Sequence, residues 1–502
     1  MRGARRRLPR GPRGVAVKVP VVIVGAGPTG LTAAALLGRY GVECLVLERW
    51  ESVYPQPRAV HLDDEVHRIL GRLGLAGAFA AISRPCHGLR LLDPDLRVLA
   101  EFRRSPGGGR HGYPEANMFD QPDLEHLLCT HLETLGAVTV RGNTEVTGIR
   151  QDGTGVRVET AERGTGTRET IHADYVLGCD GANSLARTAI GATMADLKFD
   201  QRWLVADIAT TADLGAWEGV HQVCDPGRAA TYMRIGKTRY RWEFRLLPGE
   251  TAGDFDDLGR LHPLIAPWTR EIPADELEIV RVAEYTFRAQ LANRWRDRRV
   301  FLLGDAAHLT PPFIGQGMGA GLRDAVNLAW KLAGVLDGTL PASALGTYEV
   351  ERKPHARAMI RRAVLVGKAM TEGGRIGNLI RRVVAPRLNG RVLDSATPAL
   401  HRSDLVVRPR LGRTAAGRLC PNALLDDGTR FDDVVDGRFA VVTTNTPSET
   451  ERAAIRESGA VLVPTRRSGE LHRWLRTGAA VVRPDGTVLS AGDSLSRCRY
   501  PR

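Results

Sequence analysis

The sequence predicts an α/β protein: a Rossmann-like nucleotide-binding domain, an antiparallel-sheet domain and a small α/β unit at the C-terminal end. The first domain is indicated by a strand at Val19–Val24 that passes through a glycine-rich turn into a helix at Leu31–Tyr40. The second is indicated by short runs of alternating apolar and polar residues between 200 and 290. The third is indicated by strands and helices that alternate again after residue 420.

A second strand, Val42–Leu47, completes a βαβ unit and ends at Glu48. The turn of this unit reads GAGPTG, which places three glycines at the spacing of a dinucleotide-binding fingerprint. Gly25 permits the tight turn, Gly27 lets the backbone approach a pyrophosphate, and Gly30 allows close helix–strand packing. Glu48 is expected to accept hydrogen bonds from an adenosine ribose.

A second motif, Gly304-Asp305, follows a buried strand at Val300–Leu303 and leads into the glycine-rich segment 315–321. A carboxylate at Asp305 can bind a ribityl hydroxyl, and a glycine-rich segment can lie against a flat ring system. A helix predicted over Gly321–Leu336 points its positive end at that ring, where a reduced flavin carries negative charge. This motif favours FAD over NAD as the bound nucleotide.

A third motif is Cys179-Asp180-Gly181, with Arg187 further along the chain. Asp180 and Arg187 are expected to anchor a pyrophosphate-linked cofactor or to guide a nicotinamide. The alternative is a capped helix start at Asp180, with Arg187 as a surface ion-pair partner.

The three motifs, in this order and spacing, resemble those of the class A flavoprotein aromatic hydroxylases, the p-hydroxybenzoate hydroxylase-like group. The resemblance covers most of 19–375, and residues 420–502 are similar to the thioredoxin-like appendage of such enzymes, without its CxxC. Within the group the chain looks most like 3-(3-hydroxyphenyl)propionate hydroxylases, in the PRAV at 57–60, the DDE at 63–65, the QP at 121–122 and the block 304–331.

The resemblance implies a FAD-dependent monooxygenase that hydroxylates a phenolic acid through a flavin C4a-hydroperoxide, using dioxygen and either NADPH or NADH. It also implies that Arg58 and Gln121 contact FAD and that Pro311 lines the site near the reactive flavin edge. Many relatives carry Asn where Gly319 stands. The expected cofactor-binding residues are Gly25, Gly27, Gly30, Glu48, Arg58, Gln121, Asp180, Asp305, Gly315, Gly317, Met318 and Gly319.

Two histidines are candidates for assisting deprotonation of the phenol: His61, in the loop after Arg58, and His308, after the Gly304-Asp305 motif. A structural hydrogen-bonding role is the alternative for each. In the sheet region, the side chains expected to line a substrate pocket are Tyr232, Tyr240 and Arg245.

Two other functions remain open. The same fold suits a flavin oxygenase that acts on a polyketide or antibiotic by hydroxylation, epoxidation or Baeyer–Villiger insertion. The second open function is a flavin-binding regulator that catalyses no reaction, although the intact motifs at 179–181 and 304–305 argue against it. A plain NAD dehydrogenase does not need the Gly304-Asp305 motif or the glycine-rich segment after it.

At about 150 residues per domain, 502 residues correspond to roughly two to four domains. The expected division is a basic disordered tail over 1–18, FAD-binding segments over 19–90, 121–195 and 291–375, substrate-domain segments over 91–120 and 196–290, a linker over 376–419 and the C-terminal unit over 420–502.

The formal net charge is +13, of which the tail over 1–18 carries +7. The tail lacks the apolar region of a secretory signal, and nucleic-acid binding is the lesser alternative to a disordered tail. The mildly basic remainder suits anionic cofactors and substrates, and we expect no nucleic-acid partner. The 7 cysteines form no CxxC pair, which predicts reduced thiols, no metal site and a cytoplasmic protein. No apolar run is long enough to cross a membrane. We expect a monomer or a homodimer.

Overall fold

The structure, a computed structural model, describes residues 18–54, 58–225, 227–269, 272–372, 377–378, 397–408, 414–466, 469–476 and 478–495. The basic tail expected over 1–18 lies outside these residues except for Lys18. Cys498 and most of the linker expected over 376–419 also lie outside them.

A first sheet holds the predicted βαβ unit at its centre. In spatial order it runs β17 (Arg296–Asp297), β18 (Val300–Leu302), β11 (Arg168–Gly178), β1 (Lys18–Val24), β2 (Cys44–Leu47) and β8 (Val138–Arg141), and β9 (Thr144–Gln151) and β10 (Val156–Glu162) extend it from β11. β18, β11, β1, β2 and β8 pair in parallel. Residues 21–24 of β1 are buried, as a parallel strand covered on both faces must be.

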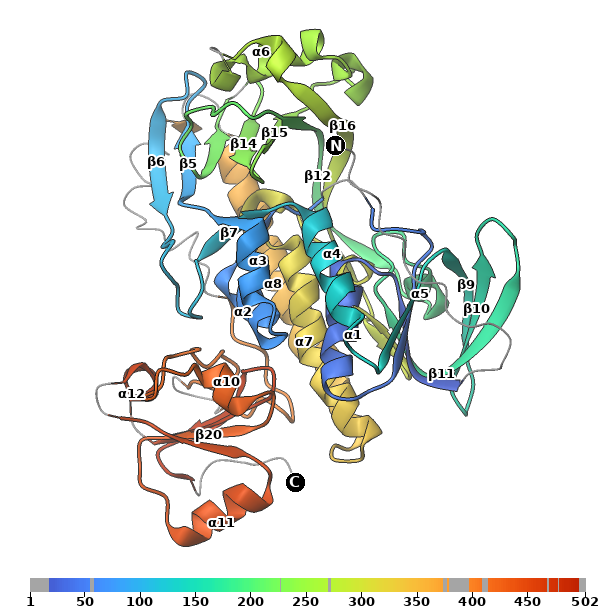
Figure 1. Cartoon of the computed structure of the whole chain (residues 1–502), viewed down its shortest axis with the longest axis vertical. Helices are drawn as coiled ribbons and strands as arrows, with labels where there is room; N and C mark the ends of the chain where they lie inside the picture. Colours follow the sequence, from blue (N-terminus) through green and yellow to red (C-terminus); the bar gives the residue numbers. More distant parts are fainter. Residues whose placement is uncertain are drawn as a thin grey trace.

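Helices cover this sheet. The three that pack together beside β1 are α1 (Pro28–Arg39), α4 (Gln121–Leu132) and α7 (Gly317–Leu336) (Figure 1). α7 begins at Gly317, whereas the prediction began it at Gly321. The remaining helices of this part are α2 (Asp64–Arg72), α3 (Ala76–Ile82), α5 (Leu185–Ala189) and α8 (Thr347–Thr371), with the short 3-10 helices η3 (Gly304–Ala306), η4 (Pro312–Ile314) and η5 (Ala342–Gly346).

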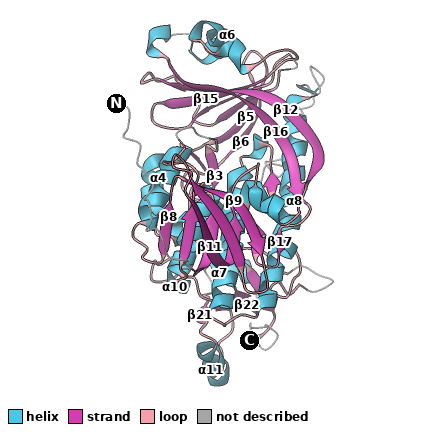
Figure 2. Ribbon diagram, turned by 90° about the vertical axis from the view of Figure 1, so that its right-hand side faces the viewer, coloured by secondary structure: helices cyan, strands magenta, loops and turns pink. Residues whose placement is uncertain are grey.

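A second sheet contains the alternating segments. Its order is β19 (His308–Leu309), β16 (Glu278–Ala292), β12 (Met194–Ala209), β15 (Arg239–Arg245), β14 (Ala230–Arg234), β13 (Val220–Val223), β5 (Gly88–Leu92) and β6 (Val98–Arg103). α6 (Leu258–Thr269) covers one face, and the first sheet and its helices lie on the other side (Figure 2). The sequence did not predict α6, because Pro263 and Pro267 inside it disguise the helical pattern.

Smaller elements connect the two sheets. A three-stranded sheet of β3 (His61–Asp63), β7 (Ala116–Phe119) and β4 (Ser83–Pro85) leads from the βαβ unit toward β5. The 3-10 helices η1 (Ala252–Phe255) and η2 (Ala274–Glu276) flank α6 along the chain.

The C-terminal unit is the small α/β unit that the sequence predicts. Its sheet runs β21 (Val461–Pro464), β20 (Ala440–Thr443), β22 (Ala479–Val482) and β23 (Val488–Gly492), with helices α10 (Phe431–Val435), α11 (Glu449–Glu457) and α12 (Glu470–Leu475). β20 pairs in parallel with β21 and antiparallel with β22, which is the order of a thioredoxin-like sheet. The unit lies below α2 at the lower left of Figure 1.

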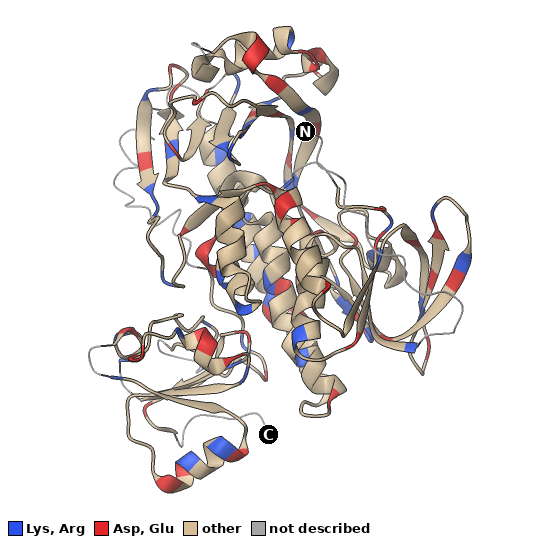
Figure 3. Cartoon of the chain, in the orientation of Figure 1, with Lys and Arg blue, Asp and Glu red and all other residues tan. Residues whose placement is uncertain are grey.

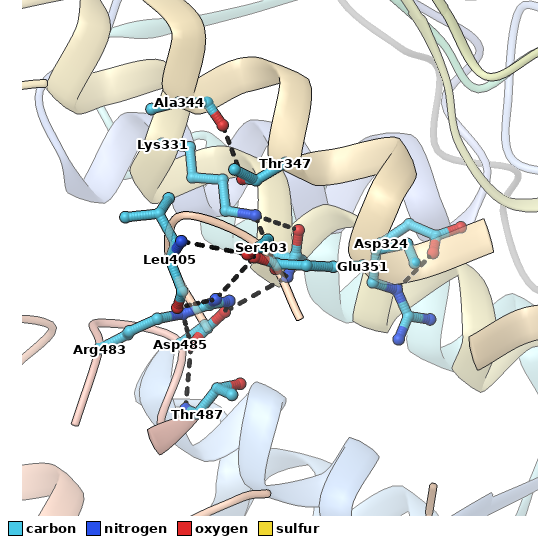
Figure 4. A network of polar contacts seen from close by, with 12 residues as sticks. Asp324, Lys331, Ala344, Thr347, Glu351, Ser403, Leu405, Arg483, Asp485 and Thr487 are labelled. Atoms are coloured by element: carbon cyan, nitrogen blue, oxygen red, sulfur yellow. Dashed lines mark hydrogen bonds and ion pairs between the residues drawn. The ribbon is translucent and has the colours of Figure 1, made fainter. Parts of the chain in front are cut away.

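Buried ion pairs join this unit to the rest of the chain. On α2, Arg68 and Arg72 both bind Asp432 of α10, at 2.6 and 2.9 Å. A second cluster centres on Glu351 of α8, which accepts hydrogen bonds from Lys331 at 2.8 Å and from Arg483 at 3.0 Å (Figure 4). All six side chains are largely buried, so these charges are removed from water only while the unit is docked.

Among the helices of the described residues, none has the length and apolar character of a membrane span. Basic and acidic residues are interspersed along the chain in Figure 3. α11, for example, carries residues of both signs.

We expect Asp432→Ala to lower the free energy of unfolding by about 3–5 kcal/mol, because it leaves two buried guanidinium groups without their carboxylate. Burial acts to raise the pKa of Asp432, but Arg68 and Arg72 outweigh this effect and hold that pKa well below its usual range. The stabilisation is therefore present at neutral pH and is lost as the pH falls through that lowered pKa. Chemical denaturation measures it. Glu449→Ala, which removes an exposed ion pair on α11, is the control and should leave the midpoint unchanged. Equal stability of the two variants would contradict the docking role.

Candidate active site

A cavity of about 410 Å³ lies between the βαβ unit, the start of α7 and the second sheet. It is lined by eight of the predicted site residues: Gly27, Arg58, His61, Gln121, Asp305, Gly315, Gly317 and Met318. The predicted residues that do not line it are Gly25, Gly30, Glu48, Asp180, His308, Pro311 and Gly319.

The three fingerprint glycines differ in what surrounds them. Gly25 has a φ of +102°, and a Cβ built on it would lie 2.5 Å from the carbonyl oxygen of Cys179. A Cβ on Gly30 would lie 2.0 Å from the carbonyl oxygen of Gly25, whereas a Cβ on Gly27 would meet nothing within 4 Å. These distances match the three steric roles predicted, with Gly27 open to the cavity.

Glu48 and Asp180 act within the protein itself. Glu48 accepts hydrogen bonds from the backbone N–H of Ala26 at 2.8 Å and of Trp50 at 3.0 Å, which fixes the fingerprint turn against β2. Asp180 accepts the backbone N–H of Ala186 at 3.0 Å. The geometry at Asp180 is therefore close to the helix-capping alternative.

Arg187 forms no surface ion pair among the described residues. It donates to the backbone carbonyls of Ala306 at 3.1 Å and Ala182 at 2.8 Å. The side chain thus connects the Cys179-Asp180-Gly181 loop to the Gly304-Asp305 turn.

Asp305 sits in η3 and lines the cavity, and its carboxylate accepts no hydrogen bond from any residue that the structure describes. It thus presents to the cavity a carboxylate that no described residue bonds. A hydroxyl-rich ligand would supply the missing donors.

The glycine-rich segment becomes the first turn of α7, and buried polar contacts hold it. Gln316, the N-cap, donates to Asp63 at 2.8 Å, and Arg323 forms an ion pair with Asp63 at 2.6 Å. Burial acts to raise the pKa of Asp63, but Arg323 outweighs it and holds the value at about 2. Gly319 lets α7 pack closely, because a Cβ there would lie 2.9 Å from both Val66 and Arg323. No pattern in the sequence indicates these roles for Asp63 and Arg323.

Gln121 fixes the loop that carries Arg58. Its side-chain oxygen accepts the backbone N–H of Ala59 at 2.7 Å, and its amide donates to Glu125 at 2.7 Å. Burial raises the pKa of Glu125 to about 7. The Arg58 guanidinium lies 5.1 Å from the centre of the Tyr54 ring, at the cavity.

The two candidate histidines lie in different surroundings. His61 lines the cavity, and its Nδ1–H donates to the carbonyl of Gly315 at 3.4 Å, which leaves Nε2 to accept. Burial lowers the pKa of His61, so its ring is neutral near pH 7. His308 is buried away from the cavity, with Nε2 bonded to Asp324 at 2.7 Å. The structural alternative therefore describes His308, and we no longer assign it a catalytic role.

Pro311 also lies behind the cavity wall. Its neighbours Thr310 and Pro312 line the cavity, and Pro311 is the N-cap of η4. It shapes the wall rather than facing the ligand.

The substrate-side prediction was wrong for all three residues, and for the two tyrosines the error was the choice of sheet face. Tyr232 and Tyr240 pack with Trp268 of α6 in an apolar core. Arg245 does not line the cavity and donates to the carbonyl of Thr371 at 3.5 Å. The side chains of the second sheet that do line the cavity are Leu89, Phe102, Val220, Gln222, Thr231, Met233, Arg241 and Glu243.

Within the described residues, no cluster of three or more His, Cys, Asp or Glu side chains is arranged to hold a metal ion.

A family profile described as "FAD binding domain" matches residues 18–363. The chain is 34% identical over 497 residues to a Rhodococcus jostii (strain RHA1) protein named "Probable NADH-specific resorcinol 4-hydroxylase", covering 94% of this chain and 91% of that protein. It is also 34% identical over 483 residues to a Mycolicibacterium smegmatis (strain ATCC 700084 / mc(2)155) protein named "3-(3-hydroxy-phenyl)propionate/3-hydroxycinnamic acid hydroxylase", covering 91% and 83%.

Among solved structures, a ternary complex of aklavinone-11 hydroxylase with FAD and aklavinone has a TM-score of 0.79 with this chain at 24% identity, covering 95% of this chain and 96% of that one. This similarity shows the shared fold.

The described residues fit FAD. Gly27 leaves open space at the start of α1, where a pyrophosphate needs close backbone approach. Neither α1 nor α7 has a side-chain hydrogen bond capping its N-terminus, and both ends border the cavity. Asp305 adds a carboxylate that accepts no hydrogen bond from the described part of the chain, which suits a ribityl chain.

Gly27→Ala and Gly30→Ala separate cofactor binding from folding. We expect Gly27→Ala to fold with unchanged apoprotein stability but to bind FAD roughly tenfold or more weakly, because the new methyl group occupies the phosphate position. Gly30→Ala should destabilise the apoprotein itself, because its Cβ overlaps the carbonyl of Gly25. Thermal unfolding and FAD titration of both variants measure this. If Gly27→Ala binds FAD normally, the phosphates lie elsewhere.

Asp305→Ala should weaken FAD binding by about 10- to 150-fold, since a charge-assisted hydrogen bond contributes about 1.5–3 kcal/mol. Fluorescence titration of the apoprotein with FAD gives the affinity. Asp337→Ala, at the other end of α7, removes a carboxylate that accepts only local hydrogen bonds and is the control. Unchanged affinity in Asp305→Ala would mean that this carboxylate does not contact the cofactor.

Proposed function

The chain belongs to the family of FAD-dependent aromatic hydroxylases, and on that premise we propose that it hydroxylates a phenolic ring with dioxygen and NADH. The enzyme class is a FAD-dependent, NAD(P)H-using monooxygenase with a small aromatic substrate. NADH and a substrate of the resorcinol or 3-hydroxyphenylpropionate kind are the finer proposals, and the names of the two relatives support them.

One observation carries the proposal. A single cavity is lined at one end by the fingerprint, Asp305 and the start of α7, and at the other by the second sheet. An aromatic substrate bound under the sheet therefore lies in the same cavity as the cofactor. This continuity is what direct transfer of an oxygen atom requires.

Bound FAD supplies a hydride acceptor and a ring that activates dioxygen. We propose that the free N–H groups at the start of α1 hold its phosphates and that Asp305 holds its ribityl hydroxyls. The start of α7, through Gly317 and Met318, faces the ring system and favours negative charge there. Arg58 offers a further positive charge at the cavity edge.

Other residues act by position. His61 fixes the carbonyl of Gly315, and Glu48, Gln121 and Asp180 fix the loops that border the cavity. Apolar side chains exclude water from the substrate end. This limits the loss of activated oxygen as hydrogen peroxide before it reaches the substrate. These apolar side chains are Leu89, Phe102, Val220, Phe313, Ile314 and Met359.

Resorcinol compared with its di-O-methyl ether, and 3-(3-hydroxyphenyl)propionate compared with its O-methyl ether, test the proposal. We expect a phenol to stimulate NADH oxidation and to yield a product with one additional ring hydroxyl. The methylated compounds have no phenolic hydroxyl to ionise, so they should give hydrogen peroxide rather than hydroxylated product. NADH and NADPH oxidation, peroxide and product mass are the measurements.

Two outcomes would contradict the proposal. The first is the absence of hydroxylated product from a range of simple phenols with FAD-loaded protein. The second is an epoxide or a ring-expanded lactone, which would indicate one of the alternative flavin oxygenase chemistries.

A further inference from the structure

Glu243 is a buried carboxyl at the cavity. The residue is 9% exposed, and its side chain forms no hydrogen bond or ion pair with any residue that the structure describes. Burying an ionisable group without a partner is strongly unfavourable in a folded protein. Such a group at the wall of a ligand cavity indicates that a ligand supplies the partner.

The register of the second sheet places Glu243 on the cavity face. It lies opposite Thr231 of β14 and Val205 of β12. Its neighbours along β15, Trp242 and Phe244, point the other way into the core under α6. The side chain is therefore held by a rigid central strand.

The polar neighbours of Glu243 bind one another. The Thr231 hydroxyl donates to the side-chain oxygen of Gln222 at 2.9 Å, and the Gln222 amide donates to the carbonyl of Ala230 at 3.0 Å. Arg241 binds Asp207 through two nitrogens, at 2.7 and 2.9 Å. None of these neighbours bonds the Glu243 carboxyl, which faces the cavity.

The surrounding wall suits an aromatic ring. Cys86, Leu89, Phe102, Val220 and Met233 line the same cavity. A flat apolar body can pack against these side chains while its hydroxyl reaches a single acidic acceptor. A carboxylate is the strongest neutral-pH acceptor for a phenolic O–H.

Several charged groups flank this carboxyl or line the same cavity. Arg241 and Asp207 flank it on the sheet, and His61, Arg104, Glu115 and Arg362 line the cavity with it. Burial raises the pKa of Glu243, with Arg241 opposing the rise and Asp207 adding to it. A higher carboxyl pKa brings it closer to that of a phenol, which makes proton transfer between them less unfavourable.

We propose that Glu243 binds the ring hydroxyl of the substrate and takes its proton. The phenolic O–H bond breaks, a new O–H bond forms on the Glu243 carboxylate, and the electron pair stays on the phenolate oxygen. The electron-rich ring is then the better nucleophile toward oxygen. The proton returns to the product hydroxyl before release, so that Glu243 ends each turnover ionised. This inference rests on the proposed function.

Glu243→Gln tests the assignment, because glutamine keeps the shape but cannot take the proton. We expect normal FAD content and a fall of about 100- to 10,000-fold in kcat/KM for hydroxylation near neutral pH. The deficit should shrink as the pH rises toward the ionisation of the free phenol. It should also shrink with ring-fluorinated resorcinol or 3-(3-hydroxyphenyl)propionate, whose hydroxyls are more acidic.

Glu243→Asp, which keeps a carboxylate, should recover part of the activity and the wild-type pH profile. It provides a second variant if Glu243→Gln does not fold. Glu284→Gln, on β16 and paired with Arg202 outside the cavity, is the matched control for removing a carboxylate from this sheet. It should resemble the wild type.

The failures are distinguishable. A wild-type protein that hydroxylates no phenol removes the proposed function itself. An active wild type with an equally active Glu243→Gln overturns only the present inference. The present inference is also overturned if the fall in kcat/KM of Glu243→Gln is the same at every pH and with every fluorinated substrate. It is overturned too if His61→Asn abolishes the pH dependence of kcat/KM and Glu243→Gln leaves it intact.

Discussion

Asp324 is fully buried in α7, and the turn that carries Asp305 is built around it. It accepts the backbone N–H of Gly304 at 3.1 Å, Nε2 of His308 at 2.7 Å and Nε of Arg352 at 2.8 Å. A buried carboxylate is tolerated only with such partners, so these contacts form together or not at all. Because the Asp305 side chain has no hydrogen-bond partner among the described residues, its position depends on this neighbouring set.

The same helix fixes two further parts of the molecule through buried charges. Arg323, one residue earlier, binds Asp63 and thereby holds the first turn of α7 at the cavity. Lys331, two turns later, binds Glu351 in the cluster that docks the C-terminal unit. The cavity wall and the docking of the last unit therefore share one rigid element. This explains why α7 is polar at several buried positions.

The sequence predicted the steric pattern of the fingerprint and the βαβ unit, because glycine spacing and strand–helix order carry that information directly. It predicted strands for the second sheet but not which face of the sheet lines the cavity. Alternation of apolar and polar residues shows which side chains share a face, but only the packing of α6 shows that Tyr240 points away from the cavity and Glu243 toward it. For His308 the sequence left a chemical and a structural role open, because adjacency to a motif does not show which way a ring points. The role of Arg323 depends on contacts between distant segments, which no local pattern contains.

The central claim is that one cavity brings cofactor, dioxygen and a phenol together so that the ring receives an oxygen atom. The most direct test supplies isotopically labelled dioxygen to the FAD-loaded protein with NADH and a phenol, and measures label in the product by mass spectrometry. We expect one labelled oxygen atom in each product molecule and one NADH consumed for each product molecule formed. Product oxygen that derives from water, or NADH oxidation that yields only labelled hydrogen peroxide with every phenol, would contradict the account.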